Sequence, residues 1–238
     1  MKTEGFGKPR YIGDPINAVR IFNDHRADEL VFLDILATRE GRLIPLEFVR
    51  NVGEEANMPF AVGGGIRSLL DIRKILSAGA EKVVLNSVAA ENPDFIAHAA
   101  DSFGSSTITV CIDVRQKRFG GLRTWTAGGT RATAYAPEEF ARLAEQMGAG
   151  EIIVQSILRD GTMEGYDLDL ITRVSEAVSI PVVALGGAGR LDDLRRAYHE
   201  THASGLAAGS MFVFHGPKRG VLINYPDRAE ITELKLAV

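Results

Sequence analysis

Short runs of apolar and β-branched residues recur along the chain, each bounded by polar or turn-forming positions. They predict strands at residues 30–35, 60–62, 82–86, 107–114, 151–157, 181–185 and 205–212. Between most of these runs the apolar positions recur at helical spacing, for example at Leu69, Ile72 and Ile75. Near-continuous hydrophobic strands that alternate with amphipathic helices indicate a parallel sheet covered by helices.

The second half of the chain repeats the first at an offset of 122 or 123 residues. The corresponding segments are Gly63-Gly64-Gly65 with Gly186-Gly187, and Asn86-Ser87 with Gly209-Ser210. In a chain of 238 residues, such a repeat predicts a single α/β domain over residues 1–238 with the (β/α)8 TIM-barrel fold. We place the two half-barrel repeats at about residues 12–125 and 126–238.

The apolar pattern shows no strand before the first predicted helix of this barrel. Residues 15–23 read as the first helix, introduced by Gly13 and the capping residue Asp14. Residues 1–11 read as the end of the preceding loop, so we expect a barrel that lacks its first strand and has two open strand edges. Either the chain starts inside a longer gene product or the barrel is completed in another way. The apolar segment 221–223 is one candidate to lie along the gap.

The two glycine runs predict phosphate binding. A strand that ends in glycine lets bare backbone N–H groups approach an anion, and the following helix adds the positive end of its dipole. A single run of this kind is as often a tight turn without a ligand. Its repetition in equivalent strand–helix contexts favours function, and two such sites indicate a ligand with two phosphates.

Polar residues at the ends of predicted strands are the candidates for chemistry, because TIM-barrel sites form at that face. Asp113 is the strongest, since a carboxylate at the end of a buried strand is costly unless it is hydrogen-bonded or used as an acid or base. Asp34 is equally consistent with a loop cap, and Asp160 lies in an Asp-Gly turn. Cys111 should face the same way as Asp113, and we interpret it as a packed core thiol.

The overall composition narrows the function classes. A net charge of −4 gives no support for binding to nucleic acid or an anionic membrane, and the single cysteine suits a reducing, cytoplasmic environment. The N-terminus does not resemble a signal sequence, and no long apolar span occurs. HExxH, paired CxxC and GxSxG arrangements are absent from the sequence. We therefore expect neither a metal nor a cofactor.

Taken together, these residues resemble the cyclase subunit of imidazole glycerol phosphate synthase over roughly residues 2–235. The most specific passages are 27–35, 62–67, 112–113, 148–152, 159–167 and 186–189. That family closes an imidazole ring on a bis-phosphorylated ribulosyl-formimino carboxamide ribonucleotide, using ammonia from a glutaminase subunit. The resemblance implies a lyase of histidine biosynthesis whose two substrate phosphates match the two glycine sites.

The resemblance also implies residue roles. Asp113 would be one member of a catalytic aspartate pair, with Asp160 assisting. Together with the strand-end positions, it assigns phosphate or substrate contacts to Lys2, Asp34, Gly63, Gly64, Gly65, Asn86, Ser87, Ser156, Gly161, Thr162, Gly186, Gly187, Gly209 and Ser210. Glu29, Lys82 and Glu151 match three members of an ion ring through which ammonia enters. The glutaminase partner would dock on that N-terminal face of the barrel.

Some positions depart from the family pattern. The family's other catalytic aspartate ends the first strand, which has no counterpart here, and the ring's arginine is missing with it. Ala127 stands where the family usually has histidine. Residues 208–216 with 221–226 look more like a paralogous branch that works with a glutaminase and an amidotransferase to amidinate surface-polysaccharide sugars. The open alternatives are therefore a cyclase, an ammonia conduit with reduced cyclase chemistry, and an N-terminally truncated cyclase.

Overall fold

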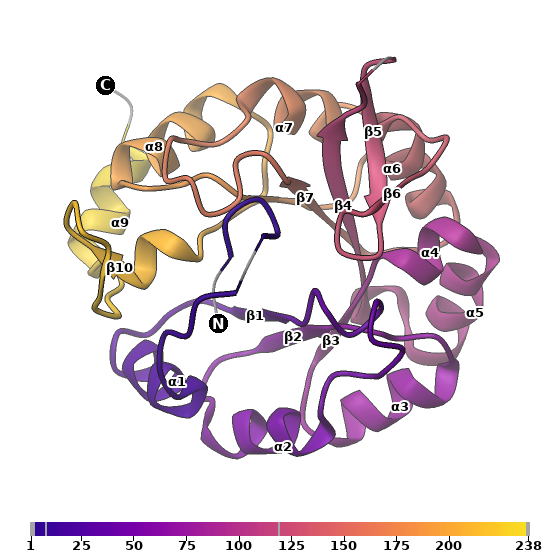
Figure 1. The fold of residues 1–238 in the computed structure, drawn as a ribbon, viewed down its shortest axis with the longest axis horizontal. Helices are drawn as coiled ribbons and strands as arrows, with labels where there is room; N and C mark the ends of the chain where they lie inside the picture. Colours follow the sequence, from indigo (N-terminus) through magenta and orange to yellow (C-terminus); the bar gives the residue numbers. More distant parts are fainter. Residues whose placement is uncertain (1–2, 8, 119, 237–238) are drawn as a thin grey trace.

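The computed structural model describes residues 3–7, 9–118 and 120–236. A curled parallel sheet forms the centre of the molecule, and α-helices surround it (Figure 1). Its strands are β1 (Leu30–Leu33), β2 (Phe60–Gly63), β3 (Lys82–Leu85), β4 (Ile108–Gln116), β7 (Glu151–Ser156), β8 (Val182–Leu185) and β9 (Gly205–Ala207). The seven predicted strands are confirmed. The last is shorter than expected because residues Ser210–Phe212 form a 3₁₀ turn, η2.

Helices follow the strands around the outside of the sheet. They are α1 (Pro15–Asp24), α2 (Leu46–Glu55), α3 (Leu69–Ser77), α4 (Ser87–Glu91), α5 (Asp94–Phe103), α6 (Pro137–Gln146), α7 (Leu168–Ser175), α8 (Leu191–Glu200) and α9 (Arg228–Lys235), with a 3₁₀ turn η1 at Ser105–Thr107. The predicted first helix begins at Pro15, and the Asp14 carboxylate caps it by accepting the Ile16 N–H at 2.8 Å. No helix of the described residues is long and apolar enough to cross a membrane.

The sheet has the connectivity of a TIM barrel. Each strand pairs in parallel with its neighbour in the order β1-β2-β3-β4-β7-β8-β9. This strand order, with helices outside, confirms the predicted (β/α)8 TIM-barrel class. β1 and β9 are the two ends of the path, and no strand pairing joins them within the described parts of the chain.

The segment expected to lie along the gap folds differently. Residues 221–223 do not extend β1 or β9. Instead β11 (Gly220–Val221) pairs antiparallel with β10 (Phe214–His215) in a separate hairpin. The segment does not close the sheet by pairing, because the turn that begins at Gly216 reverses the chain and Leu222 N–H donates to the carbonyl of Val213 at 2.9 Å.

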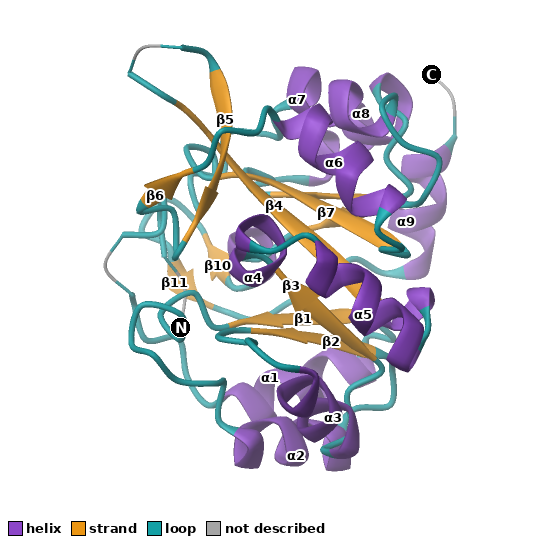
Figure 2. Ribbon diagram, turned by 90° about the vertical axis from the view of Figure 1, so that its right-hand side faces the viewer, coloured by secondary structure: helices purple, strands orange, loops and turns teal. Residues whose placement is uncertain are grey.

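One feature of the sheet was not predicted. After β4 the chain turns back as β5 (Leu122–Thr126), which pairs antiparallel with β4 and with the short β6 (Arg131–Ala132). This hairpin projects beyond the layer of helices (Figure 2). Arg115 stacks 3.8 Å from the centre of the Trp125 ring, and the Trp125 indole N–H donates to the Arg115 carbonyl at 3.0 Å. The hairpin is thereby fixed to the end of β4.

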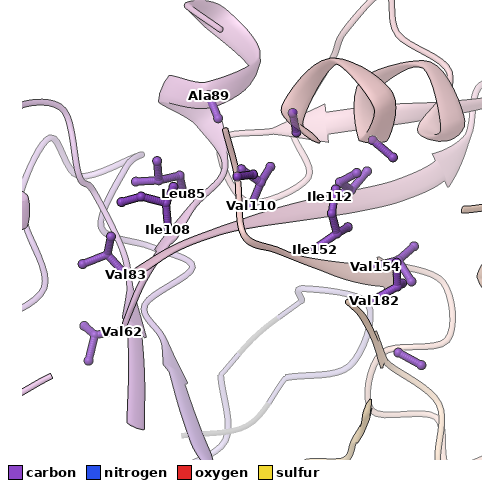
Figure 3. Packing of buried hydrophobic residues seen from close by; sticks show 14 of the residues in the cluster. Val62, Val83, Leu85, Ala89, Ile108, Val110, Ile112, Ile152, Val154 and Val182 are labelled. Carbon is purple, nitrogen blue, oxygen red and sulfur yellow. The ribbon is translucent and has the colours of Figure 1, made fainter. Parts of the chain in front are cut away.

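The hydrophobic core has two layers, one on each face of the curled sheet. The outer layer packs the sheet against the helices, as at Val83, Leu85, Val110, Ile112, Ile152 and Val154 (Figure 3). The inner layer is a separate small cluster of Ala61, Val84, Cys111 and Ile153. Because strand residues alternate between faces, neighbouring positions of one strand belong to different layers.

Candidate active site

Alternate residues of three strands repeat one pattern on the inner face of the sheet. The columns are Lys82–Val84–Asn86, Thr109–Cys111–Asp113 and Glu151–Ile153–Gln155, each read from the start of the strand to its end. All three columns have a charged or polar first residue, a middle residue from the inner apolar cluster and a polar last residue. The barrel interior is therefore polar at both mouths and apolar between them.

The three residues predicted to belong to an ion ring, Glu29, Lys82 and Glu151, lie together at the N-terminal mouth of the barrel. Lys82 Nζ is 3.2 Å from Glu29 Oε2 and 3.0 Å from Glu151 Oε2. Thr109 donates its hydroxyl to Glu151 Oε1 at 3.0 Å. Burial lowers the pKa of Lys82, but the carboxylates of Glu151 and Glu29 together have a larger effect, so that the pKa is raised overall. Burial also raises the pKa of Glu29, although the charge of Lys82 opposes this rise.

A cavity of about 470 Å³ opens at the opposite mouth, at the C-terminal ends of the strands. Its lining includes Phe6, Asp34, Gly63, Gly64, Gly65, Asn86, Ser87, Asp113, Ala127 and Gln155. The structure thus brings the first glycine run, the Asn86-Ser87 pair and the strongest catalytic candidate into one space. A cavity of this volume is within the usual range of small-molecule sites.

Asp113 is buried at the top of its column, with 6% of its surface exposed. Its Oδ1 accepts from the Cys111 thiol at 3.4 Å, and its Oδ2 accepts from the Asn86 amide at 3.3 Å. Burial raises the pKa of Asp113 to about 7; the Cys111 hydrogen bond opposes this rise and the charge of Asp160 adds to it. A carboxyl group with this pKa can both accept and donate a proton near neutral pH.

Asn86 and Ser87 link the end of β3 to Asp113 and to the β5–β6 turn. The Asn86 amide also donates to the Cys111 carbonyl at 3.0 Å, and its own oxygen accepts from the Ser87 hydroxyl at 3.2 Å. Ser87 Oγ in turn accepts the Ala127 N–H at 2.9 Å. In this structure the Asn86 side chain is therefore directed at the catalytic candidate.

Asp160 lies in the loop after β7, with 8% of its surface exposed. Its carboxylate accepts from the Thr3 hydroxyl at 3.0 Å and from the Gln155 amide at 3.4 Å. The Asp160 carbonyl accepts the Gly5 N–H at 2.9 Å. Residues 3–7, which we call the N-terminal strap, cross the C-terminal mouth here (Figure 1).

The second glycine run borders a much smaller space, of about 20 Å³. Its lining consists of Asp160, Gly161, Leu185, Gly186, Gly187, Ala188, Ala208, Gly209 and Ser210. The Ser210 hydroxyl is buried there and has no hydrogen-bond partner within the described residues. Buried polar atoms are normally paired, so this hydroxyl retains an unused capacity to form a hydrogen bond.

The remaining predicted contacts are placed as follows. Asp34 caps the loop after β1, accepting the Leu36 N–H at 3.1 Å and pairing with Arg42 at 2.6 Å. Ser156 is buried at the end of β7. The Thr162 hydroxyl donates to the carbonyl of Arg159 within its own turn at 2.9 Å. Lys2 lies outside the described residues.

The comparisons with known proteins identify the family of this fold and site. The family model described as "Histidine biosynthesis protein" matches residues 1–217. The chain belongs to this family.

Relatives of this chain carry more specific names. It is 43% identical to "Imidazole glycerol phosphate synthase subunit HisF" of Alkaliphilus metalliredigens, over 90% of this chain and 85% of that one. A Pseudomonas aeruginosa protein, provisionally named as subunit hisF2 of the same synthase, is 44% identical over 95% of this chain and 90% of its own length. The resemblance to the cyclase subunit family is confirmed.

Two polar contacts of this family member were missed from the sequence. Gln155 pairs with Asp113 in the β4–β7 ladder and donates to Asp160, so it lies between the two aspartates. The signal was present, because Gln155 interrupts an apolar strand at an inward-facing position. Thr3 carried no such signal, since its contact with Asp160 spans 157 residues. Within the described residues, no group of three His, Cys, Asp or Glu side chains is arranged to hold a metal ion.

Proposed function

We propose that this chain closes an imidazole ring on a bis-phosphorylated ribulosyl-formimino carboxamide ribonucleotide, with ammonia from a glutaminase partner. The observation that carries this proposal is Asp113. It is buried at the top of an inward column, faces a cavity bordered by a glycine run, and has a pKa raised to about 7. Ring closure with ammonia requires repeated proton transfers, which a carboxyl group of this pKa supports.

Two phosphate sites would hold the ends of the substrate. One is formed by Gly64, Gly65 and Ser87 at the large cavity, and the other by Gly187 and Ser210 at the small one. Backbone N–H groups after a strand, followed by a helix N-terminus, suit phosphate oxygens. The unpartnered Ser210 hydroxyl supports the second site.

Ammonia would enter at the opposite mouth, past Glu29, Lys82 and Glu151, where we propose that the glutaminase docks. The inner apolar cluster lies between these charges and Asp113, so a small neutral molecule meets no unpaired charge on the way. In this proposal the barrel axis connects the partner's product with the ring-closing site.

The test is product formation from the linear bis-phosphate substrate with saturating ammonium. Asp113→Asn should reduce turnover by about 10²- to 10⁴-fold, the usual contribution of a general acid or base. Asp101→Asn, on the exposed surface of α5, is the matched control and should leave turnover unchanged.

Unchanged turnover in Asp113→Asn would remove Asp113 from the mechanism. Absence of turnover in the unmodified chain, with retained binding of a glutaminase, would contradict the cyclase proposal. That outcome would favour an ammonia conduit for the amidination of surface-polysaccharide sugars.

A further inference from the structure

Cys111 is a buried polar group that the proposed mechanism does not use. It belongs to the inner apolar cluster with Ala61, Val84 and Ile153, and it is two residues before Asp113 on the same face of β4. A thiol in such a cluster would ordinarily serve only to fill space. Here its sulfur lies 3.4 Å from Asp113 Oδ1.

The two oxygens of Asp113 have different partners. Oδ2 accepts from the Asn86 amide, whose nitrogen is also anchored by the Cys111 carbonyl at 3.0 Å. Oδ1 accepts from the Cys111 side chain. Residue 111 therefore contacts the aspartate directly through its thiol and indirectly through its backbone, which fixes the carboxylate plane from two sides.

The thiol is in the protonation state needed to donate. Burial raises the pKa of Cys111 well above its usual range, and the nearby Asp113 charge raises it further. The sulfur therefore keeps its proton at neutral pH. A neutral donor at this position stabilises the ionised form of Asp113 without adding a charge to the apolar interior.

We propose that Cys111 is a positioning residue for Asp113, whose thiol holds Oδ1 so that the carboxylate faces the cavity as a general acid or base. This inference rests on the proposed function of Asp113. It assigns to the side chain at position 111 a role in the chemistry that an apolar residue of similar size could not fill.

Other polar and charged groups also lie around Asp113. From the neighbouring elements these are Asn86 directly after β3, the carbonyl of Trp125 on β5, Gln155 on β7 and Asp160 in the following loop. Charged groups elsewhere in the cavity lining are Asp34, Arg67, Glu91 and Arg131. Only Cys111 and Asn86 donate to the Asp113 carboxylate in the hydrogen bonds observed among the described residues. A change confined to Cys111 therefore tests one of two donors.

Infrared spectroscopy tests the contact without any turnover. Because the chain has one cysteine, its S–H stretching band belongs to Cys111 alone. Donation to a carboxylate lowers the frequency of this band. We expect Asp113→Asn to move the band to higher frequency, and in the unmodified chain the band should shift as pH passes through about 7, where Asp113 titrates. An identical, pH-independent band in both proteins would overturn the proposal even if the chain is an active cyclase.

The pH profile of ammonia-dependent turnover then tests the consequence. Loss of a donor to the ionised form raises the pKa of a carboxyl group, so Cys111→Ala should move the acidic limb upward by about half a pH unit or more. Cys111→Ser retains a donor and should restore the limb to its original position or below it.

A packing control separates the hydrogen bond from the loss of volume. Ile153→Val removes a methylene group from the same apolar cluster without removing a donor. It should lower the free energy of unfolding without moving the acidic limb. If Cys111→Ala and Ile153→Val move the limb equally, or if Cys111→Ser behaves like Cys111→Ala, the thiol only fills space and the proposal fails.

Discussion

The two glycine-ended strands β2 and β8 are built alike but open onto different spaces. A Cβ on Gly65 would lie 1.8 Å from the carbonyl oxygen of Arg42, and a Cβ on Gly187 would lie 2.2 Å from that of Gly165. These are equivalent positions of the repeat, and both glycines have positive φ, +71° and +112°. Each glycine run is thus pressed against the loop that follows the preceding strand.

The helices after the two runs are also started in the same way. Asp71 accepts the N–H groups of Arg67 and Ser68 at 3.1 and 3.0 Å. Asp193 accepts those of Gly189 and Arg190 at 2.9 and 3.1 Å. The backbone frame that we propose for a phosphate site, a glycine run followed by a helix start, is therefore present twice.

The two glycine runs differ in the size of the cavity that each one borders and in the segments that lie next to it. The first opens into the cavity of about 470 Å³, whereas the second borders only about 20 Å³. Thr3 and Gly5 of the N-terminal strap contact Asp160 beside the second frame, and a Cβ on Gly161 would lie 2.2 Å from the carbonyl oxygen of Thr3. An internal repeat thus determines the frame of a site, while non-repeated segments determine the space above it.

The largest expected effect concerns the aspartate in the open cavity. The pKa of Asp113 is about 7 in the folded protein and near 3.8 when exposed. Between about pH 4 and 7 the native state keeps a proton that the unfolded chain has released, so the free energy of unfolding should fall as pH rises through this window, by up to about 4 kcal/mol. Urea unfolding at several pH values measures this slope, and Asp113→Asn should flatten it. A slope retained in that variant would assign it to other groups.

The next effect tests the shared frame. Gly65→Ala and Gly187→Ala should each lower the free energy of unfolding by about 2–4 kcal/mol, because the added Cβ meets a backbone carbonyl that cannot move freely. Gly216 (φ +69°) and Gly13 (φ +111°) have matched backbone angles with no atom within 4 Å of an added Cβ. Their alanine variants should cost only about 1 kcal/mol, the price of the angle itself. If all four variants lose the same free energy of unfolding, the positive φ angle explains the need for glycine, and the contact of an added Cβ with a backbone carbonyl does not.

The frame was predictable from the sequence because it depends on local pattern. Apolar runs located the seven parallel strands seen in the described part of the chain, and the spacing of Cys111 and Asp113 correctly placed both side chains on one face. The space above the frame was not predictable. The contact of Thr3 with Asp160 and the pairing of Glu4 with Arg219 join residues far apart in the sequence, and no periodicity reports them. The β5–β6 hairpin was missed because short strands between glycines resemble loops.

The contacts that hold the N-terminal strap beside the second glycine run should contribute less to the free energy of unfolding than the glycine run itself. Arg219 donates to the carbonyls of Gly161 and Thr162 at 3.2 and 2.9 Å and pairs with Glu4 at 2.9 Å. Arg219→Ala should lower the free energy of unfolding by about 1–2 kcal/mol, mostly through the two carbonyl contacts, because exposed ion pairs contribute little. It should also speed tryptic cleavage after Arg10, which follows the strap.

Arg20→Ala is the control for this effect, since it breaks an exposed ion pair between α1 and α2, with Glu55 at 3.0 Å, and none of the strap's contacts. It should change the free energy of unfolding little and leave the cleavage rate unchanged, because exposed ion pairs contribute little to stability. Equal cleavage rates in the two variants would show that Arg219 does not secure the strap.

The smallest expected effect is a change in the free energy of unfolding that has opposite signs at the two glycine-run sites. Ser87 Oγ accepts the Ala127 N–H, whereas Ser210 Oγ is buried without a partner among the described residues. Ser87→Ala should therefore lower the free energy of unfolding by about 1 kcal/mol, and Ser210→Ala should raise it by a similar amount while weakening the binding of inorganic phosphate. Calorimetric unfolding with and without phosphate measures both. If the two variants lose stability equally and bind phosphate equally, the Ser210 hydroxyl is not reserved for a ligand, and the second frame is a packing element alone.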